Sequence, residues 1–130
     1  MSIIAETLAD FGKSIGLENL TFRDNGTVLL DMEKLGSLAI EWIGDRQETV
    51  SLSLIRRIEV PDERACKRLL ESCHYRSPAP FPTRLGLAGA GELFFAVRLE
   101  AREFTLPGIH QALEWLIAVH DQNSSSVRYA

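Results

Sequence analysis

The sequence predicts an α+β domain with the element order α-β-β-β-α-β-β-α. Apolar residues recur with helical spacing in three segments, and five shorter segments bounded by turn signals read as strands, three of them with alternating apolar residues. The first three strands follow one another through short turns, without the regular alternation of strand and helix that is typical of a parallel sheet. We therefore expect a five-stranded, mainly antiparallel sheet with helices packed on it.

The first helix is expected over residues 2–15. Its apolar stripe has the spacing i, i+4, i+7, i+11 and consists of Ile4, Leu8, Phe11 and Ile15. Gly16 follows directly, and glycine commonly ends a helix because it adopts a left-handed conformation at little cost.

Three strands are expected next, at residues 27–32, 37–43 and 49–58. The Asn25-Gly26 pair before them is a strong turn signal. In the third strand Val50, Leu52 and Leu54 alternate with serines, so one face of that strand is apolar. Short turns at 33–36 and 44–47 join the three strands into an antiparallel meander.

A second helix is expected after Pro61, with Asp62 as its N-cap, because an aspartate side chain accepts hydrogen bonds from the first free backbone amides of a helix. The apolar face of this helix consists of Ala65, Cys66, Leu69, Leu70 and Cys73. The proline-rich connector at 77–82 excludes both a helix and a central strand.

The last third of the chain is predicted to hold two strands and a closing helix. The strands lie at 83–88 and 92–99 around a glycine turn, and the second has Leu93, Phe95, Val97 and Leu99 on one face. A Leu106-Pro107 corner then begins a helix that runs to about residue 121. The apolar arc of this helix spans roughly 200°, twice what packing on one surface needs, so we expect the helix to bury two faces. The arc consists of Ile109, Ala112, Leu113, Trp115, Leu116, Ile117, Val119 and His120.

Length and composition indicate one globular domain over residues 1–121 and a flexible polar tail at 122–130. The formal net charge of −4 argues against a nucleic-acid-binding protein. No apolar run reaches the roughly 18 residues of a membrane span, and the first residues lack the pattern of a signal peptide. The expected location is therefore the cytoplasm.

No arrangement of residues predicts catalysis or metal binding. His110 and Glu114 are four residues apart on the closing helix, but no third ligand is near them, and we interpret them as a solvated pair. Cys66 and Cys73 would stand roughly 10 Å apart along a helix, too far for a disulfide. We therefore expect no enzyme activity, no metal and no cofactor.

Some apolar residues fall where a half-solvated sheet should be polar. Phe94 and Ala96 lie on the outward face of the last strand, and Ile55 breaks the alternation of the third strand. In the first strand, Leu29 lies on the other face from Val28, Leu30 and Met32. Two interpretations are open. Either helices cover both faces of the sheet, with or without a bulge, or these residues form a surface for a partner.

Four parts of the chain together carry a resemblance to a known family. They are the end of the first helix (residues 8–17, LADFGKSIGL), the pattern Phe22, Gly26, Leu30, Met32 in the first strand, the run at 92–95 (ELFF) after a glycine turn, and Leu106-Pro107 before a helix containing Trp115. In this combination the chain resembles the class I chaperones of bacterial type III secretion systems, the Tir-chaperone-like family. The likeness covers nearly the whole chain.

The resemblance implies a homodimer in the bacterial cytoplasm. It would bind the N-terminal chaperone-binding segment of one or more secreted effectors and keep that segment extended, soluble and competent for export. The export ATPase or a regulator would be further partners, and no cofactor is implied. The alternative is a non-secretory or regulatory protein-interaction domain of the same fold.

The resemblance also suggests site residues. In the family the second helix and the neighbouring strand usually build the dimer, which here implies Leu69, Leu70 and Cys73 near a two-fold axis. Phe94 and Trp115 are left over from the expected core, and we expect them to meet the second chain as well. The expected effector-binding residues are Phe11, Leu29, Trp42 and Phe94. The proline-rich stretch at 78–82 departs from the family pattern and bears on the dimer geometry.

Overall fold

The structure is a computed structural model that describes residues 3–44, 48–59, 61–72, 81–89, 91–124 and 129. Its helices and strands follow the predicted order, with one short 3-10 helix inside the meander, at Glu33–Leu35, and another directly after the last strand, at Ala101–Glu103. In chain order they are α1 (Ile3–Ser14), β1 (Thr27–Asp31), η1 (Glu33–Leu35), β2 (Ser37–Gly44), β3 (Glu48–Arg57), α2 (Glu63–Ser72), β4 (Thr83–Ala88), β5 (Glu92–Glu100), η2 (Ala101–Glu103) and α3 (Leu106–Gln122).

The five strands form one antiparallel sheet in the order β1-β2-β3-β5-β4, which confirms the predicted fold class. The meander β1-β2-β3 makes one half. The chain then leaves the sheet through α2 and returns as the β4-β5 hairpin, whose second strand pairs with β3. In that pairing Leu54 lies opposite Phe95, and Leu52 opposite Val97. The two longest apolar strands therefore form the centre of the sheet.

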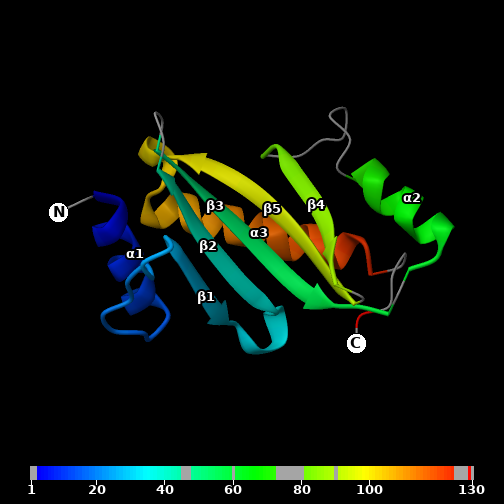
Figure 1. The fold of residues 1–130 in the computed structure, drawn as a ribbon, viewed down its shortest axis with the longest axis horizontal. Helices are drawn as coiled ribbons and strands as arrows, with labels where there is room; N and C mark the ends of the chain where they lie inside the picture. Colours follow the sequence, from blue (N-terminus) through cyan, green and yellow to red (C-terminus); the bar gives the residue numbers. More distant parts are fainter. Residues whose placement is uncertain are drawn as a thin grey trace.

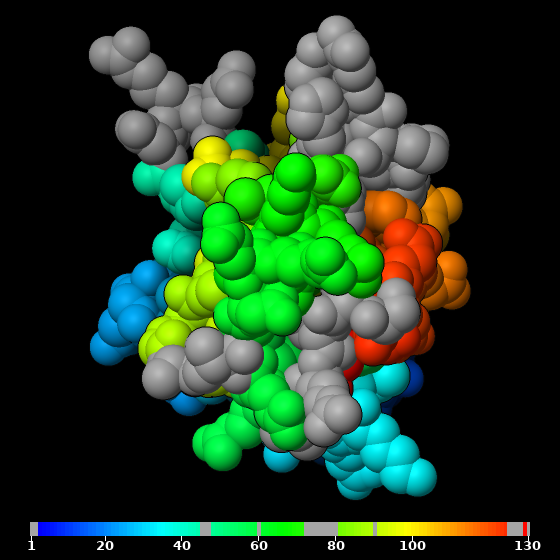
Figure 2. Space-filling view, turned by 90° about the vertical axis from the view of Figure 1, so that its right-hand side faces the viewer, coloured from blue at the N-terminus to red at the C-terminus, as the bar shows by residue number. Residues whose placement is uncertain are grey.

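The described helices cover one face of the sheet. α3 crosses behind the sheet and α1 lies beside its β1 end, whereas α2 stands beyond β4 (Figure 1). Figure 2 shows α2 towards the viewer, with the strands to one side of it and α3 to the other. The face turned towards α3 holds the main core, including the fully buried Leu38, Leu54 and Phe95. On the opposite face no described helix lies over the strands. The uncovered face favours the interpretation that the outward apolar residues form a surface for a partner.

Both predicted helix starts are confirmed by their caps. The Asp62 carboxylate accepts a hydrogen bond from the Ala65 amide over 2.8 Å. Thr105 caps α3 by accepting from the Gly108 amide over 3.1 Å, and Pro107 lies in the first turn, where its missing N–H costs no helical bond. At the other end of the chain's first helix, Gly16 has a φ of 86°, as predicted for a helix end.

The wide apolar arc of α3 is filled within the chain. Ile109, Leu116 and Val119 are buried, and α3 contacts β3 and β5 on one side and α1 on another. Trp115 turns towards the sheet edge, where its indole N–H donates to the Thr83 hydroxyl of β4 over 2.8 Å. The helix buries more than one face, as expected, and all of these contacts come from its own chain.

The apolar face of α2 differs from the prediction at one position. Ala65 and Leu69 are buried and Cys66 is partly buried, but Leu70 is 65% exposed. Residues one apart on a helix point about 100° apart, and α2 stands at the margin of the molecule, so only part of its apolar face reaches the core. Cys73 lies outside the described residues.

Candidate functional site

The described residues provide surfaces rather than a reaction centre. Among them, no three His, Cys, Asp or Glu side chains gather where they could hold a metal ion. No helix in the described part of the chain has both the length and the apolar character needed to cross a membrane. His110, which the sequence pairs with Glu114, is exposed and its ring packs edge-on against Phe11 with the centroids 5.8 Å apart.

A groove of about 520 Å³ runs between α1 and the start of α3. Its apolar lining includes Ile4 and Phe104, which belong to the core, and Ile3, which is 73% exposed at its rim. Charged side chains stand beside these apolar groups. We call this surface the α1 groove; it is lined by Ile3, Ile4, Thr7, Asp10, Glu48, Ala101, Arg102, Phe104, Thr105 and Leu106.

A second apolar feature lies at the β2 end of the sheet. The Trp42 indole packs against Phe22 at 5.4 Å between ring centroids, tilted by 52°. Trp42 is only partly buried as a residue, but its indole nitrogen is fully covered and has no hydrogen-bond partner among the described residues. An N–H that is buried without an acceptor costs free energy. The indole N–H of Trp42 is therefore an unsatisfied buried donor.

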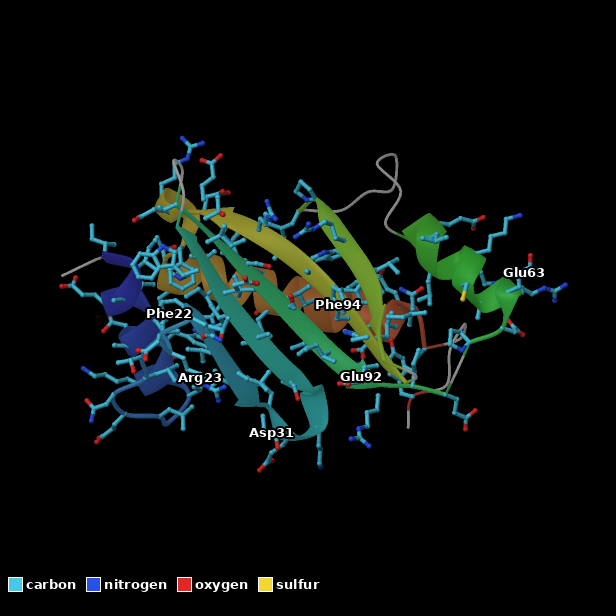
Figure 3. All side chains as sticks on the ribbon, viewed as in Figure 1. Phe22, Arg23, Asp31, Glu63, Glu92 and Phe94 are labelled. Carbon is cyan, nitrogen blue, oxygen red and sulfur yellow. The ribbon has the colours of Figure 1, made fainter. Side chains whose placement is uncertain are left out.

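The structure does not bring the four expected effector-binding residues together. Phe11 is completely buried in the core, and Trp42 lies on the helix-covered side of the sheet beside Phe22. Leu29 is 57% exposed on the edge strand β1 and, like Phe94, belongs to the open face. Figure 3 places Phe94 near the β4–β5 side and Phe22 at the far end beside α1.

The five residues expected at a dimer interface are also distributed over different environments. Leu69 is buried against the chain's own core, whereas Leu70 on the next position is exposed. Phe94 packs its ring over Gly86, where an added Cβ would clash with it. Trp115 is engaged with Thr83, and Cys73 is not among the described residues.

One polar cluster was not predicted. His120 of α3 is completely buried, with Nε2 2.7 Å from the Leu54 carbonyl oxygen and Nδ1 3.0 Å from the Tyr129 hydroxyl. Burial lowers the pKa of His120 to about 4; the nearby Arg56 guanidinium acts in the same direction, while the Leu54 hydrogen bond and Asp121 act against it. Burial also raises the pKa of Tyr129 to about 12.

The sequence contained only half of the signal for this cluster. Helical periodicity placed His120 on the apolar face of the closing helix, which is where it lies. Its partners are 66 residues earlier in β3 and nine residues later in the stretch expected to be a tail, and periodicity carries no information about such contacts. Within that stretch Asn123 is also buried, and its amide donates to the Val119 carbonyl over 2.8 Å.

Comparison with known proteins places this fold among secretion chaperones. Over residues 3–123 the chain matches the family model described as type III secretory system chaperone SycN. No match was found among curated protein sequences.

Solved structures agree over nearly the full length of the chain. A chain of the ExsC–ExsE complex is similar with a TM-score of 0.74 at 19% identity, covering 96% of this chain and 93% of that one. The Yersinia pestis type III secretion chaperone SycH, in complex with a stable fragment of YscM2, gives a TM-score of 0.69 at 12% identity, covering 94% of this chain and 98% of that one. The HopA1–SchA chaperone–effector complex gives 0.68 at 19% identity, covering 92% and 91%.

At these identities the structures establish the shared fold, and the family model establishes the relationship. The match extends from the first residue of α1 to just beyond the end of α3, so it includes the groove, the open sheet face and all five strands. The chain therefore belongs to the SycN family of type III secretory system chaperones.

Proposed function

We propose that this chaperone acts as a homodimer that binds the N-terminal chaperone-binding segment of one or more secreted effectors. Binding keeps that segment extended, soluble and competent for export. The observation that carries the proposal is the family match over residues 3–123, on a fold with an apolar groove that lies open beside α1. The SycH and SchA structures, each solved with a bound protein, support the same role by analogy.

The α1 groove is the surface we assign to cargo. Apolar side chains of an unfolded segment would contact Ile3, Ile4 and Phe104, and each square ångström of apolar surface removed from water contributes about 25 cal/mol. Part of that gain is offset by the entropy lost when the segment becomes ordered. The outcome is binding that holds a segment without folding it into a domain.

The edge strand β1 is a second place for cargo. Within the described sheet, β1 pairs only with β2, so its other edge is available to an added strand. Leu29 is exposed there and would give an added strand an apolar neighbour. An extended segment could therefore use backbone hydrogen bonds at β1 and side-chain contacts in the α1 groove.

For the dimer, α2 is the element we propose. Leu70 exposes an apolar side chain on a helix that stands at the margin of the molecule, where a second copy has access to it. Phe94 on the open face of the neighbouring strand lies on the same half of the sheet. Both belong to the elements that build dimers in the family the sequence resembles.

The other expected properties belong to the same proposal. A chaperone of this kind holds its cargo by contact alone, so we propose no catalytic activity. The site of action is the bacterial cytoplasm, where effectors are made. The export ATPase or a regulator would meet the chaperone with its cargo bound.

Co-expression with N-terminal fragments of secreted proteins from the same genome tests the proposal. We expect one or more fragments to co-purify, and we expect Ile3→Asp to weaken the complex at least tenfold because it puts a charge on the rim of the α1 groove. Leu87→Asp is the matched control, since Leu87 is also an exposed aliphatic residue but lies on β4, away from the groove. Retention of a folded regulator and no secreted fragment would favour the alternative of a non-secretory interaction domain.

A further inference from the structure

Tyr129 is joined to the body of the protein through its backbone, its hydroxyl and its ring. Its backbone forms an isolated antiparallel bridge with Ile58. Its hydroxyl donates to the His120 carbonyl oxygen over 3.0 Å and lies 3.0 Å from Nδ1 of the same residue. The Arg56 Cζ stands 5.6 Å from the centroid of the tyrosine ring, within the range of a cation–π interaction.

Tyr129 lies in a socket formed by Arg56, Ile58 and His120. The His120 side of this socket is held by contacts that do not involve Tyr129. Nε2 of His120 is 2.7 Å from the Leu54 carbonyl oxygen in the central strand β3. The imidazole also meets the Phe95 ring edge-on, with the centroids 4.8 Å apart. Both partners belong to the fully buried core, so His120 keeps its orientation whether or not Tyr129 is present.

The Arg56 wall is held independently as well. Its Nε donates to the Leu35 carbonyl oxygen over 2.7 Å, and its Nη1 pairs with the Asp121 carboxylate at 3.0 Å. Only 15% of the Arg56 side chain is exposed, so these bonds are partly shielded from water. The guanidinium is therefore fixed in the plane against which the tyrosine ring packs.

The bridge with Ile58 lies at the point where the chain leaves the sheet for α2. Ile58 is buried, and its amide donates to the Gly91 carbonyl oxygen over 2.8 Å. Tyr129 provides its antiparallel partner. In the described part of α2 itself, the buried residues are Ala65 and Leu69. Ile58 is therefore one of the points that fix the entry to α2, beside the packing of Ala65 and Leu69.

We propose that Tyr129 is a clasp that locks the entry of α2 onto the body of the protein, in a socket formed by Arg56, Ile58 and His120 that is selective for a tyrosine on an extended backbone. A phenylalanine would fill the space of the ring but would leave the His120 carbonyl without this donor. A lysine or arginine is disfavoured by the Arg56 guanidinium. The clasp goes beyond cargo binding and requires neither cargo nor a second copy of the chain.

Release of the clasp would have two physical consequences. The segment from Ile58 through α2 would lose one of its attachments, so its amides would open to solvent more often. The polar groove of about 510 Å³ that Tyr129 shares with Arg57 and Glu92 would lose one of its walls. The same residue would therefore affect both the mobility of α2 and the shape of this groove.

Hydrogen exchange of the full chain tests the clasp directly. In Tyr129→Phe we expect the amides of residues 58–72 to exchange about fivefold faster than in the wild type, because one hydrogen bond is lost. Gln122→Ala is the control, since Gln122 is exposed near the same end of α3 and should leave these amides unchanged. Equal exchange of Tyr129→Phe and wild type over residues 58–72 would overturn the proposal.

A peptide supplied in trans tests the selectivity of the socket. We expect a chain that stops at Ser124 to show fast exchange at 58–72, and the acetylated peptide SSVRYA, which corresponds to residues 125–130, to slow it again. A peptide with phenylalanine in place of the tyrosine should need about tenfold higher concentration. No effect of the first peptide, or an equal effect of both, would contradict the socket. Since α2 is also the element proposed for the dimer, each pair of proteins is compared in the same oligomeric state, checked by sedimentation velocity. Failure of the clasp is then distinguishable from failure of the proposed function.

Discussion

At the scale of single residues, His120 stands out because it is a titratable side chain that is completely buried. A histidine with no exposed surface is held neutral, since burial lowers its pKa from the usual 6.5 to about 4. Its neighbours include both a cation, Arg56, and an anion, Asp121. The Tyr129 hydroxyl has a single proton to donate, and two acceptor atoms of His120 lie 3.0 Å from it, namely Nδ1 and the carbonyl oxygen.

This environment predicts a pH dependence of stability. Between pH 6.5 and 4 the unfolded chain binds a proton at this histidine that the folded chain does not, so the free energy of unfolding decreases as the pH falls through that window. The expected loss is about 3 kcal/mol at most. Urea unfolding at a series of pH values measures it.

Two variants isolate the contribution of His120. His120→Gln should flatten the dependence between pH 6.5 and 4, whatever its effect on stability at pH 7. His110→Gln should leave the dependence as in the wild type, because His110 is exposed. The same slope in wild type and His120→Gln would show that the buried imidazole is not the group responsible.

At the scale of elements, two neighbouring leucines of α2 lie in different environments, although the sequence places both on one apolar face. Leu69 is buried against the body of the protein, while Leu70 is 65% exposed. Leu69→Ala should lower the free energy of unfolding by about 2–4 kcal/mol, since a buried leucine is replaced by a cavity. Leu70→Ala should change it by less than about 0.5 kcal/mol.

Leu70→Ala, which should barely change stability, should weaken self-association. If α2 builds the dimer, Leu70→Ala weakens it, which sedimentation velocity measures over a range of protein concentrations. A dimer affinity in Leu70→Ala equal to that of the wild type would remove α2 from the interface. Leu69→Ala would not serve for this test, because it alters the fold.

The elements themselves were predictable because their signals are local. Period-two alternation identified three of the strands, turn signals marked off the other two, and Asp62 and the Leu106-Pro107 corner identified two helix starts. The contacts of individual side chains were not predictable in the same way. Trp115 looked like an excess aromatic residue, but its partner Thr83 lies 32 residues earlier, and Tyr129 meets Ile58 across 71 positions. Spacing along one element cannot identify a partner on another.

Site residues were harder to predict than elements for a related reason. Phe11 follows the same helical stripe as Ile4 and Leu8, and that stripe faces the core. The rim of the α1 groove is instead made by Ile3, one position away on the helix surface. An apolar residue chosen by type alone is most often a core residue, so a binding surface becomes visible only when the neighbouring elements are in place.

At the scale of the whole molecule, one face of the sheet packs against helices and the other carries no described helix. The described residues of a single copy leave four surfaces uncovered: the open sheet face, the outer edge of β1, the α1 groove and the exposed side of α2. A formal net charge of −4 helps to keep such a surface soluble. This distribution fits a protein whose work is to hold other chains.

The mass of the purified complex with a secreted fragment, measured by light scattering during size-exclusion chromatography, tests the central claim most directly. We predict two copies of the chain for each fragment, with the free chaperone at about 29 kDa, twice the 14.5 kDa of one chain. A free chaperone that stays at the mass of one chain at micromolar concentration, or a complex that contains a single copy, would contradict the account.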